Sequence, residues 1–386
     1  MNILVIGNGF DLAHVLPTKY TNFLNFCKKI EGIYTYANNK NYKSYVRENL
    51  NGWMINNEIK QALEEAYKSR KINYHEKGLD GLKVHTNFKY LDELYACIKE
   101  NIWIEYFMKC NMIGKENWID FESEISEVVQ SLGEDMNIVG GNIRIENNIQ
   151  KISNFLLNAK YYGLPKTYKD VRDDLLNNLN KLIRAFEIYL TEYIEKIEIQ
   201  KKSPNIDALE IDHILSFNYT NTYEKVYNNF KDVEYDYIHG KADIGNTIDT
   251  DNIVLGIDEY LPEKRRNKDI DFIAFKKYYQ RILKQTGCKY KEWVDEIRNN
   301  QHASYNEYNL YIFGHSLDVT DKDILRDVIL NDNVYTTIFY HNKDVMGQQI
   351  ANLVKAIGQD ELIRRTGGST KTINFELQKD MEPIEK

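Results

Sequence analysis

Cysteine is scarce in this 386-residue sequence, and the cysteines that it has lie far apart in the chain. No C-x-x-C motif occurs, so neither a zinc ribbon nor a disulfide framework is predicted. No set of histidine and acidic residues has the spacing of a metal site, so no metal is expected. Isolated thiols are typical of a protein in a reducing compartment. The cysteines are Cys27, Cys97, Cys110 and Cys288.

Long apolar runs and an excess of basic residues are also absent. No segment approaches the roughly 18 consecutive apolar residues of a membrane span, and the N-terminus lacks the basic flank and cleavage site of a signal peptide. We therefore expect a cytoplasmic protein with no membrane partner. The formal net charge of -8 argues against a broad basic surface for duplex DNA, so a nucleic-acid partner is not expected.

Strand-like patterns concentrate at the two ends of the chain, whereas the middle has helical periodicity. The clearest helix is predicted over residues 169–197, where apolar residues recur at steps of mostly three or four. We predict an α/β fold in which residues 1–30 and 205–360 form a Rossmann-like parallel sheet flanked by helices. Residues 31–204 are predicted to be a large helical insertion, and residues 361–386 a polar C-terminal tail without a convincing core face.

The N-terminal stretch is an apolar strand that runs directly into Gly7-Asn8-Gly9. Gly7 can adopt a positive φ, and Gly9 has no Cβ to keep a ligand from the backbone amides, so the turn favours a phosphate at the start of the next helix. The dinucleotide fingerprint G-x-G-x-x-G is incomplete, because Leu12 stands where its third glycine belongs. An ordinary turn between a strand and a helix is the alternative.

Polar residues and glycines also follow strands that are predicted nearer the C-terminus. Because ligands of an open parallel sheet bind outside the carboxyl ends of its strands, we expect these groups to converge with Gly7-Asn8-Gly9 on one edge. The groups are Asn218, His239-Gly240 and Gly314-His315-Ser316. The strands are predicted over residues 211–217, 235–238, 253–255, 309–313 and 334–340.

Several of these residues also have a structural interpretation. His239 can be a hydrogen-bonded histidine at a strand end, and Asn218 can cap the helix that follows it. His14 and His315 lie near the motifs without an assigned proton to move, so structural roles are favoured for both.

The helical middle of the chain contains one further acidic motif, W-I-D-F-E. Its acids, Asp120 and Glu122, precede a predicted helix, where they either serve a site or complement the positive end of the helix dipole. The second role is favoured.

Taken in order, these motifs resemble the bacterial abortive-infection AbiH family. The resemblance implies an antiphage abortive-infection effector. Val15 is a departure, because the family more usually has glycine there. The motifs are I-G-N-G-F-D-L-A-H-x-L-P-T, W-x-D-F-E, S-F-N-Y-T, I-H-G and F-G-H-S-L-D, and they fall between residue 3 and about residue 345.

A more distant resemblance, to sirtuins, carries chemistry. The spacing from Gly7 to Pro17, followed by an Asn-bearing turn, an H-G pair and a G-x-S-L motif, reproduces the order of sirtuin motifs. This resemblance implies a Rossmann-like fold that binds NAD, as in the NAD-cleaving modules of bacterial antiphage systems. The zinc-binding cysteine pairs of deacetylating sirtuins are absent, so protein deacetylation is not expected.

The sirtuin resemblance also implies roles for individual residues. Asn218 would orient water or the ribose hydroxyls, and His239 would be the general base for cleavage of the nicotinamide–ribose bond. Asp11, at the serine position of the sirtuin motif, would lie near the nicotinamide ribose. NAD is expected as substrate or ligand, with no resident cofactor. The residues expected to bind it are Gly7, Asn8, Gly9, Asp11, Gly240, Gly314, His315 and Ser316.

Two hypotheses from different classes follow. The first is an effector that hydrolyses NAD to nicotinamide and ADP-ribose when infection relieves restraint by the helical insertion. The second is a nucleotide-binding sensor that signals to a partner without catalysis. A nuclease-like effector is disfavoured, because the sequence is acidic and has no clear metal-binding cluster of acids. The expected partners are NAD or a related nucleotide, a phage-derived trigger and a second copy of the chain.

Overall fold

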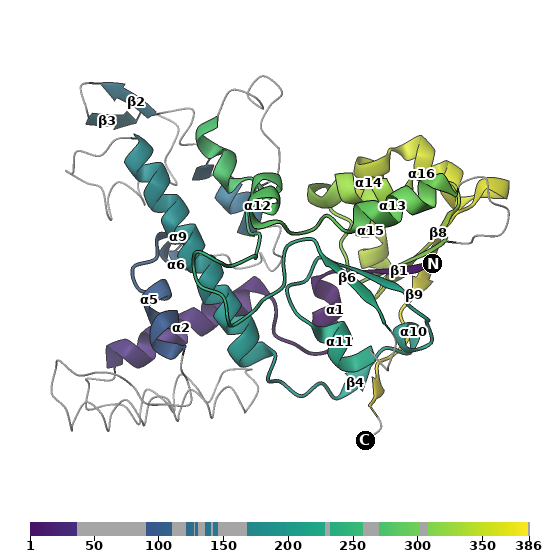
Figure 1. The fold of residues 1–386 in the computed structure, drawn as a ribbon, viewed down its shortest axis with the longest axis horizontal. Coiled ribbons are helices and arrows are strands. Elements are labelled where there is room, and N and C mark those ends of the chain that lie inside the picture. The colour runs from purple at the N-terminus through teal and green to yellow at the C-terminus, as the bar shows by residue number, and fades with distance from the viewer. Residues whose placement is uncertain are drawn as a thin grey trace. The chain divides into compact units, whose positions relative to one another are not determined.

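The computed structural model describes most of the chain outside its helical middle, and it divides into two compact units (Figure 1). Each unit is assembled from separate stretches of sequence. Unit 1 comprises Met1–Thr18, Glu198–Ala242 and Lys284–Lys386, and unit 2 comprises Lys19–Ile197 and Asp243–Leu283. The described residues are 1–36, 90–109, 121–126, 128–129, 136–139, 142–145, 168–227, 232–257, 270–300 and 308–384.

Unit 1 is built on a six-stranded, fully parallel sheet. Its strands are β1 Asn2–Ile6, β5 His213–Ser216, β6 Glu234–Tyr237, β7 Tyr308–Phe313, β8 Val334–Tyr340 and β9 Ile373–Leu377. Their order across the sheet is β6-β5-β1-β7-β8-β9. Counted along unit 1, this is the 3-2-1-4-5-6 order of doubly wound dinucleotide-binding folds, so the predicted Rossmann-like fold is confirmed. The order reverses between β1 and β7, which is the switch point of the sheet.

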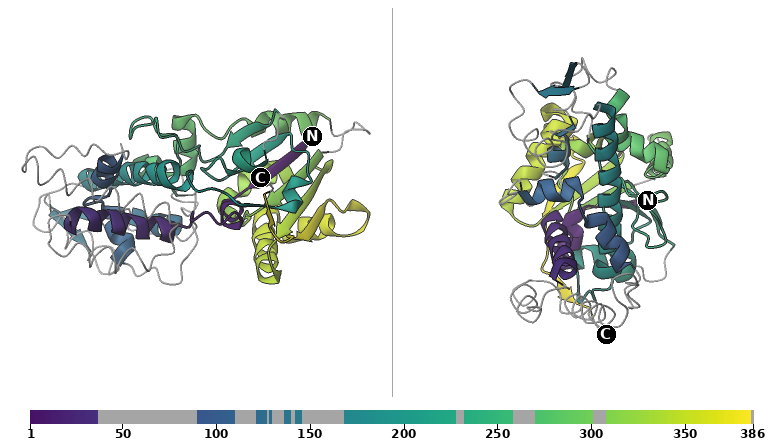
Figure 2. Two further views of the ribbon diagram at one scale, coloured as in Figure 1. Left: turned by 90° about the horizontal axis from the view of Figure 1, so that it is seen from below. Right: turned by 90° about the vertical axis from the view of Figure 1, so that its left-hand side faces the viewer.

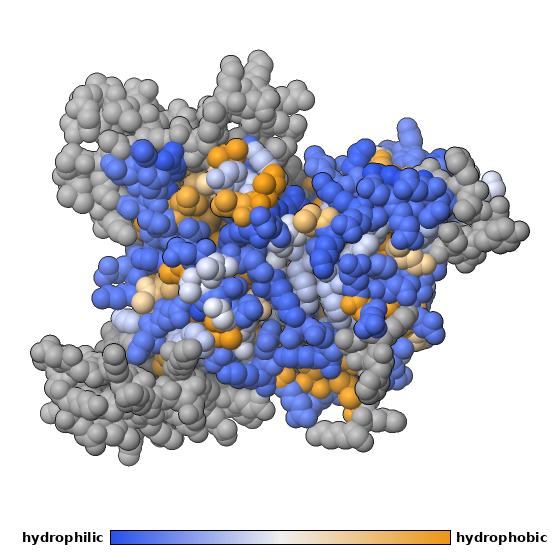
Figure 3. All heavy atoms as spheres, viewed as in Figure 1, coloured by the Kyte–Doolittle hydropathy of each residue, from blue (hydrophilic) through white to orange (hydrophobic). Residues whose placement is uncertain are grey.

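Helices cover both faces of this sheet (Figure 2). They are α1 Asn8–Ala13, α10 Pro204–Asp207, α11 Thr222–Tyr227, α13 Tyr290–Asn299, α14 Lys322–Ile329, α15 Lys343–Ile357 and α16 Gln359–Thr366, with the 3-10 turns η4 Val319–Asp321 and η5 Gly368–Thr370. The outward surface over α13, α14 and α16 is mainly hydrophilic, as amphipathic helices require (Figure 3).

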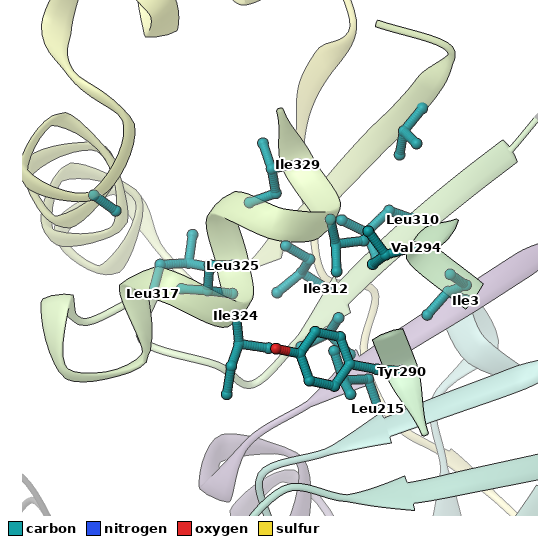
Figure 4. Packing of buried hydrophobic residues seen from close by; sticks show 14 of the residues in the cluster. Ile3, Leu215, Tyr290, Val294, Leu310, Ile312, Leu317, Ile324, Leu325 and Ile329 are labelled. Atoms are coloured by element: carbon teal, nitrogen blue, oxygen red, sulfur yellow. The ribbon is translucent and has the colours of Figure 1, made fainter. Parts of the chain in front are cut away.

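Side chains of β1 alternate between the two covered faces, which explains why this strand is apolar after its first residue, Asn2. Ile3 and Val5 lie on the face that α13 and α14 cover (Figure 4). Leu4 and Ile6 lie on the opposite face, with residues of α1, α10 and α11. A strand buried on both sides needs no polar residue between its ends.

One predicted strand is wrong. Residues 253–255 are buried and lie in unit 2, where they do not form a strand. Leu255 N donates to Gln280 Oε1, and Gln280 Nε2 donates to Leu255 O, both at 3.1 Å. A single buried amide side chain therefore satisfies the backbone groups that a neighbouring strand would otherwise pair with.

The C-terminal segment also differs from the prediction, because it is not a tail without a core face. Residues 361–366 belong to α16, and β9 forms the edge of the main sheet beside β8. Ile373 is the buried residue of β9. Apolar residues alternate with polar ones over Ile373, Phe375 and Leu377, but this pattern is only five residues long and lies in a polar context, and the prediction missed it. A further short strand, β10 Glu382–Pro383, pairs with β4 Lys201–Lys202.

Unit 2 is mainly helical within its described residues. The helix predicted over residues 169–197 is confirmed as α9 followed by a π-helical turn, η2. Unit 2 extends beyond the predicted insertion, because Glu187 on α9 accepts hydrogen bonds from Asp243 N and Asn246 Nδ2 and so holds part of residues 243–283. Its elements are α2 Tyr20–Tyr36, α5 Leu91–Ile98, α6 Ile102–Lys109, β2 Met136–Val139, β3 Asn142–Ile145, α9 Tyr168–Tyr189, η2 Leu190–Ile194, η3 Ile270–Phe275 and, except for its last residue, α12 Lys277–Lys284.

Candidate functional site

The four predicted groups meet at the carboxyl edge of the unit 1 sheet. They follow β6, β5, β1 and β7, which are neighbours in the sheet and parallel to one another. Loops that follow adjacent parallel strands begin at the same edge of the sheet and therefore lie side by side. The structure therefore brings His239, Asn218, Gly7 and Gly314 to one edge, as the sequence predicts.

At the switch point, the loops after β1 and β7 lie in direct backbone contact, and we call Gly7, Gly9 and Gly314 the glycine clasp. Gly9 N donates to Gly314 O at 2.8 Å. A Cβ on Gly9 would stand 2.8 Å from Gly314 Cα, and a Cβ on Gly314 would stand 2.1 Å from Phe10 N. A Cβ on Gly7 would likewise stand 2.8 Å from Gly314 O.

The glycine clasp gives these glycines a reason other than the ligand approach predicted from the sequence. The space beside Gly9 is filled by the chain itself, and the amide of Gly9 already has an acceptor. Phe10 N donates to Gly7 O at 2.8 Å. Asn8, between the two glycines, accepts a hydrogen bond from Thr18 Oγ1 at 2.7 Å through Oδ1. The clasp is therefore a chain-to-chain contact that fixes the positions of both loops.

A buried acid lies beside this contact on α1. Asp11 is 2% exposed, and Thr220 Oγ1 donates a hydrogen bond of 2.8 Å to Asp11 Oδ2. Burial raises the pKa of the Asp11 carboxyl group to about 6, although hydrogen bonds from Thr222 and Thr220 oppose the shift. Near neutral pH this carboxyl group can both accept and release a proton.

Asn218 completes this polar group after β5. Its side chain is 3% exposed and lowers the pKa of Asp11, yet Nδ2 has no hydrogen-bond partner of good geometry in the part of the chain that the structure describes. A buried amide N–H without an acceptor costs about 1–3 kcal/mol, so such a group is rare unless a ligand or water completes it. Asp11 and Asn218 together offer an acceptor and a donor that lacks a hydrogen bond of good geometry.

Two histidines face a single carboxylate at the ends of β6 and β7. Asp321 Oδ1 lies 3.6 Å from His239 Nε2, and Asp321 Oδ2 lies 3.4 Å from His315 Nε2. The Phe217 ring contacts both imidazoles, with centroid distances of 5.6 Å to His239 and 4.3 Å to His315. All three ionisable side chains are at least seven-eighths buried, because the largest exposed fraction, that of Asp321, is 12%.

The other predicted residues of this edge differ in their surroundings. Gly240 has a φ of +82°, which favours glycine at that turn. Ser316 has an exposed side chain, and its backbone oxygen accepts a hydrogen bond from Asn352 Nδ2 at 2.9 Å. Gln349 Nε2 donates to His315 O at 3.3 Å, so two side chains of α15 hold the loop after β7.

His14 has the structural role that the sequence favoured. Its Nδ1 donates to Phe10 O at 2.7 Å, and its Nε2 lies 2.8 Å from the hydroxyl of Tyr227. The tautomer follows from the first contact, because a carbonyl oxygen can only accept. Burial lowers the pKa of His14, so the imidazole is neutral and connects α1 to α11.

The acidic motif of the helical middle lies partly outside the described residues, which include Glu122 but not Asp120. Glu122 pairs with the buried Lys277 at 2.8 Å within unit 2. In the described part of the chain, no group of three or more histidine, cysteine or acidic side chains is arranged to hold a metal ion. None of the helices described there is long and apolar enough to cross a membrane.

Comparison with known proteins agrees with the order of motifs along the chain. A family model described as bacteriophage abortive infection AbiH matches residues 3–341. The chain belongs to the AbiH family. The match contains every residue of the carboxyl-edge site, and it ends before β9. Membership associates this AbiH protein with bacteriophage abortive infection.

The other comparisons add no relative. Neither the curated proteins nor the solved structures contain a match to the chain. The sirtuin resemblance therefore continues to rest on the order and spacing of motifs.

Sequence reasoning missed Asp321 in this site. Asp321 is the N-cap residue of α14, a position where aspartate is common for a purely local reason. Only the tertiary structure shows that its carboxylate faces two imidazoles that arrive from different strands.

Proposed function

We propose that this AbiH protein binds NAD or a related nucleotide at the carboxyl edge of the unit 1 sheet and hydrolyses its nicotinamide–ribose bond as an antiphage effector. The position of the site supports the proposal, because the sheet has dinucleotide-binding strand order and the polar residues lie around its switch point. The order of sirtuin-like motifs supports NAD as the nucleotide.

The observation that carries the proposal is the pairing of Asp11 with Asn218. A buried carboxyl group with a pKa of about 6 lies beside a buried amide donor that lowers this pKa but makes no hydrogen bond of good geometry to any described residue. A ribose diol matches this pair, because one hydroxyl can donate to the carboxylate while a hydroxyl oxygen accepts from the amide. Neither side chain is needed for a hydrophobic core, so their burial favours a role in binding.

The proposed reaction needs one water molecule and one proton acceptor. As the C1′–N bond of the nicotinamide ribose breaks, its electron pair stays on the nicotinamide nitrogen, which becomes neutral. The water oxygen forms the new bond to C1′, and His239 accepts the proton that this water releases. The products are nicotinamide, ADP-ribose and a proton, and Asn218 orients the water or the ribose during the step.

The decisive experiment follows NAD in cells that this protein protects against a phage. We expect NAD to fall and nicotinamide to rise after infection of cells with the parent protein. His239→Ala and Asn218→Ala should each lower the rate by roughly 10²–10⁴, as loss of a general base or a positioning group typically does. Purified variants should still bind NAD in calorimetric titrations.

His341→Ala is the matched control. His341 also follows a strand of the same sheet, but its side chain is exposed and it lies after β8, beyond the proposed site. The His341→Ala variant should deplete NAD to the same extent as the parent protein. Protection without loss of NAD would contradict hydrolysis, and binding of NAD without nicotinamide release in protected cells would favour the sensor hypothesis.

A further inference from the structure

Asp321 occupies a capping position that its side chain does not use. It is the N-cap residue of α14, yet its carboxylate makes no capping hydrogen bond to that helix. By contrast, Asp318 caps the preceding turn η4 in the usual way, by accepting from Thr320 N at 3.1 Å. The Asp321 carboxylate instead faces His239 and His315.

We infer that Asp321 is a positioning residue that holds the imidazoles of His239 and His315 and stabilises the charge that His239 gains when it accepts a proton. This inference rests on the proposed function for its catalytic part. Its structural part, that one carboxylate orients both rings, stands on the geometry alone.

The backbone fixes the ring of His315 toward Asp321. Leu317 N donates to His315 Nδ1 at 2.9 Å, so Nδ1 acts as the acceptor. In a neutral imidazole the proton must then lie on Nε2, which is the atom that faces Asp321. The Leu317 side chain is fully buried in the core beneath α14, which holds this residue in place (Figure 4). Its backbone has a φ of +58°.

The second oxygen of Asp321 faces His239 Nε2 at 3.6 Å. This separation allows an ion pair and is longer than a hydrogen bond, which is common in catalytic groups before the substrate binds. When His239 takes the proton of the attacking water, it becomes a cation beside the carboxylate. In this largely buried position an opposite charge is poorly screened, so the carboxylate favours the charged imidazole.

Kinetics of full-length variants test the catalytic part. Asp321→Asn keeps the size of the side chain and a good N-cap residue but removes the negative charge. We expect kcat for NAD hydrolysis to fall roughly 10²-fold with little change in KM, because the charge acts on the transition state. The acidic limb of the pH–rate profile should move down by about one pH unit, because the proton acceptor loses an anionic neighbour. Asp321→Glu should restore the position of this limb.

Asp323→Asn is the control for these measurements. It removes the same charge from an exposed residue in the first turn of α14 and should leave kcat and the pH–rate profile unchanged. A purely structural role for Asp321 would lower the amount of folded enzyme without moving the pH profile. That result would overturn the inference.

Imidazole 15N spectra test the structural part without any activity. The signals are assigned from spectra of His239→Ala and His315→Ala. In the parent we expect each ring as a single tautomer with the proton on Nε2, and in Asp321→Ala we expect the His239 signals to average between tautomers. Unchanged spectra in Asp321→Ala would refute the positioning role. If the parent never cleaves NAD, the proposed function fails, while altered spectra would still support the orientation of both rings.

Discussion

The two halves of the carboxyl edge use their sequence motifs in opposite ways. After β1 and β7, the glycine clasp brings backbone against backbone, and the clasp amide of Gly9 has its hydrogen-bond partner within the fold. After β5 and β6, Asn218 and His239 bring buried polar side chains to the edge, and the Asn218 amide makes no hydrogen bond of good geometry to any described residue. One half is complete without a ligand, and the other has unused hydrogen-bonding capacity.

This difference shows what a glycine-rich strand end does and does not indicate. The absence of a Cβ allows close approach of any group, and at the glycine clasp that group is another loop of the same protein. Glycines therefore locate the switch point, whereas the chemistry must come from the side chains around it. We therefore expect substitutions in the glycine clasp to change the stability of the protein through steric contacts. Substitutions in the other half of the edge, which we call the polar half, should act through the charge of its side chains.

The largest expected effect is that of Gly314→Ala, which tests the clasp. Gly314 has a φ of +68°, and its new Cβ would stand 2.1 Å from Phe10 N and 2.4 Å from Gly9 C. Because both are backbone atoms, neither can rotate away, and the two loops must separate. We expect a loss of about 4 kcal/mol or more in the free energy of unfolding, measured by urea titration, which is enough to unfold many domains.

Gly368→Ala separates the steric effect from the backbone effect. Gly368 has a φ of +69°, but a Cβ there would meet nothing within 4 Å. It should cost only about 1 kcal/mol, the usual penalty of an L-residue in the left-handed region. Equal losses in the two variants would show that the clasp contributes nothing, and the contrast between the two halves would disappear.

The next effect concerns the charge on Asp11, in the polar half. Its pKa rises to about 6 in the folded state, so the folded protein holds this proton more tightly than the unfolded chain. The stabilisation from the neutral form is complete below about pH 4 and is lost as the pH rises through 6. The shift of about two pKa units corresponds to roughly 3 kcal/mol.

Asp11→Asn makes this loss measurable, because asparagine does not ionise. The stability of the variant relative to the parent should increase by roughly 2 kcal/mol between pH 4.5 and pH 7.5, measured by urea titration at each pH. The difference between variants cancels the titration of all other groups. Asp323→Asn, on the exposed side of α14, should show no comparable increase. A pH-independent difference for Asp11→Asn would mean that the carboxyl group is ionised at little cost.

Much of unit 1 could be predicted from the sequence because most of its strands are short runs rich in apolar residues that end in polar turns. Residues Asn2–Ile6 and Val334–Tyr340 form strands with the predicted bounds. One error arises where a side chain replaces a strand, as Gln280 does beside Leu255. The other is β9, whose alternation of apolar and polar residues spans only five positions within a polar segment.

The site was predictable in its location but not in its contacts. Motifs at strand ends indicated the carboxyl edge, because parallel strands bring such ends together. The glycine clasp was not predictable, because a glycine, which has no Cβ, leaves room equally for a phosphate and for another loop. Asp321 was missed because an aspartate before a helix has a sufficient local explanation in capping. The glycine clasp joins residues about 300 positions apart in the sequence, and the contact between Asp321 and His239 joins residues about 80 positions apart. Local sequence patterns do not encode contacts over such separations.

The smallest expected effect sharpens the comparison at the end of α1, which carries Asp11. Leu16 N donates to Asp11 O at 3.0 Å and Val15 N to Leu12 O at 3.0 Å, the hydrogen bonds of a Schellman motif. Val15 occupies the left-handed position of this motif, with a φ of +64° and 76% exposure.

Glycine is preferred at this position, because a β-branched residue there is strained by about 1–2 kcal/mol. Val15→Gly should therefore stabilise the protein by about 0.5–1 kcal/mol, after the larger chain entropy of glycine is subtracted. Val15→Asn should give a smaller gain, because asparagine tolerates this conformation better than valine. Urea titrations measure both changes in stability. The proposed NAD hydrolysis should be unaffected, since the Val15 side chain is 76% exposed. A loss of stability in Val15→Gly would show that the exposed valine makes a contact that outweighs its backbone strain.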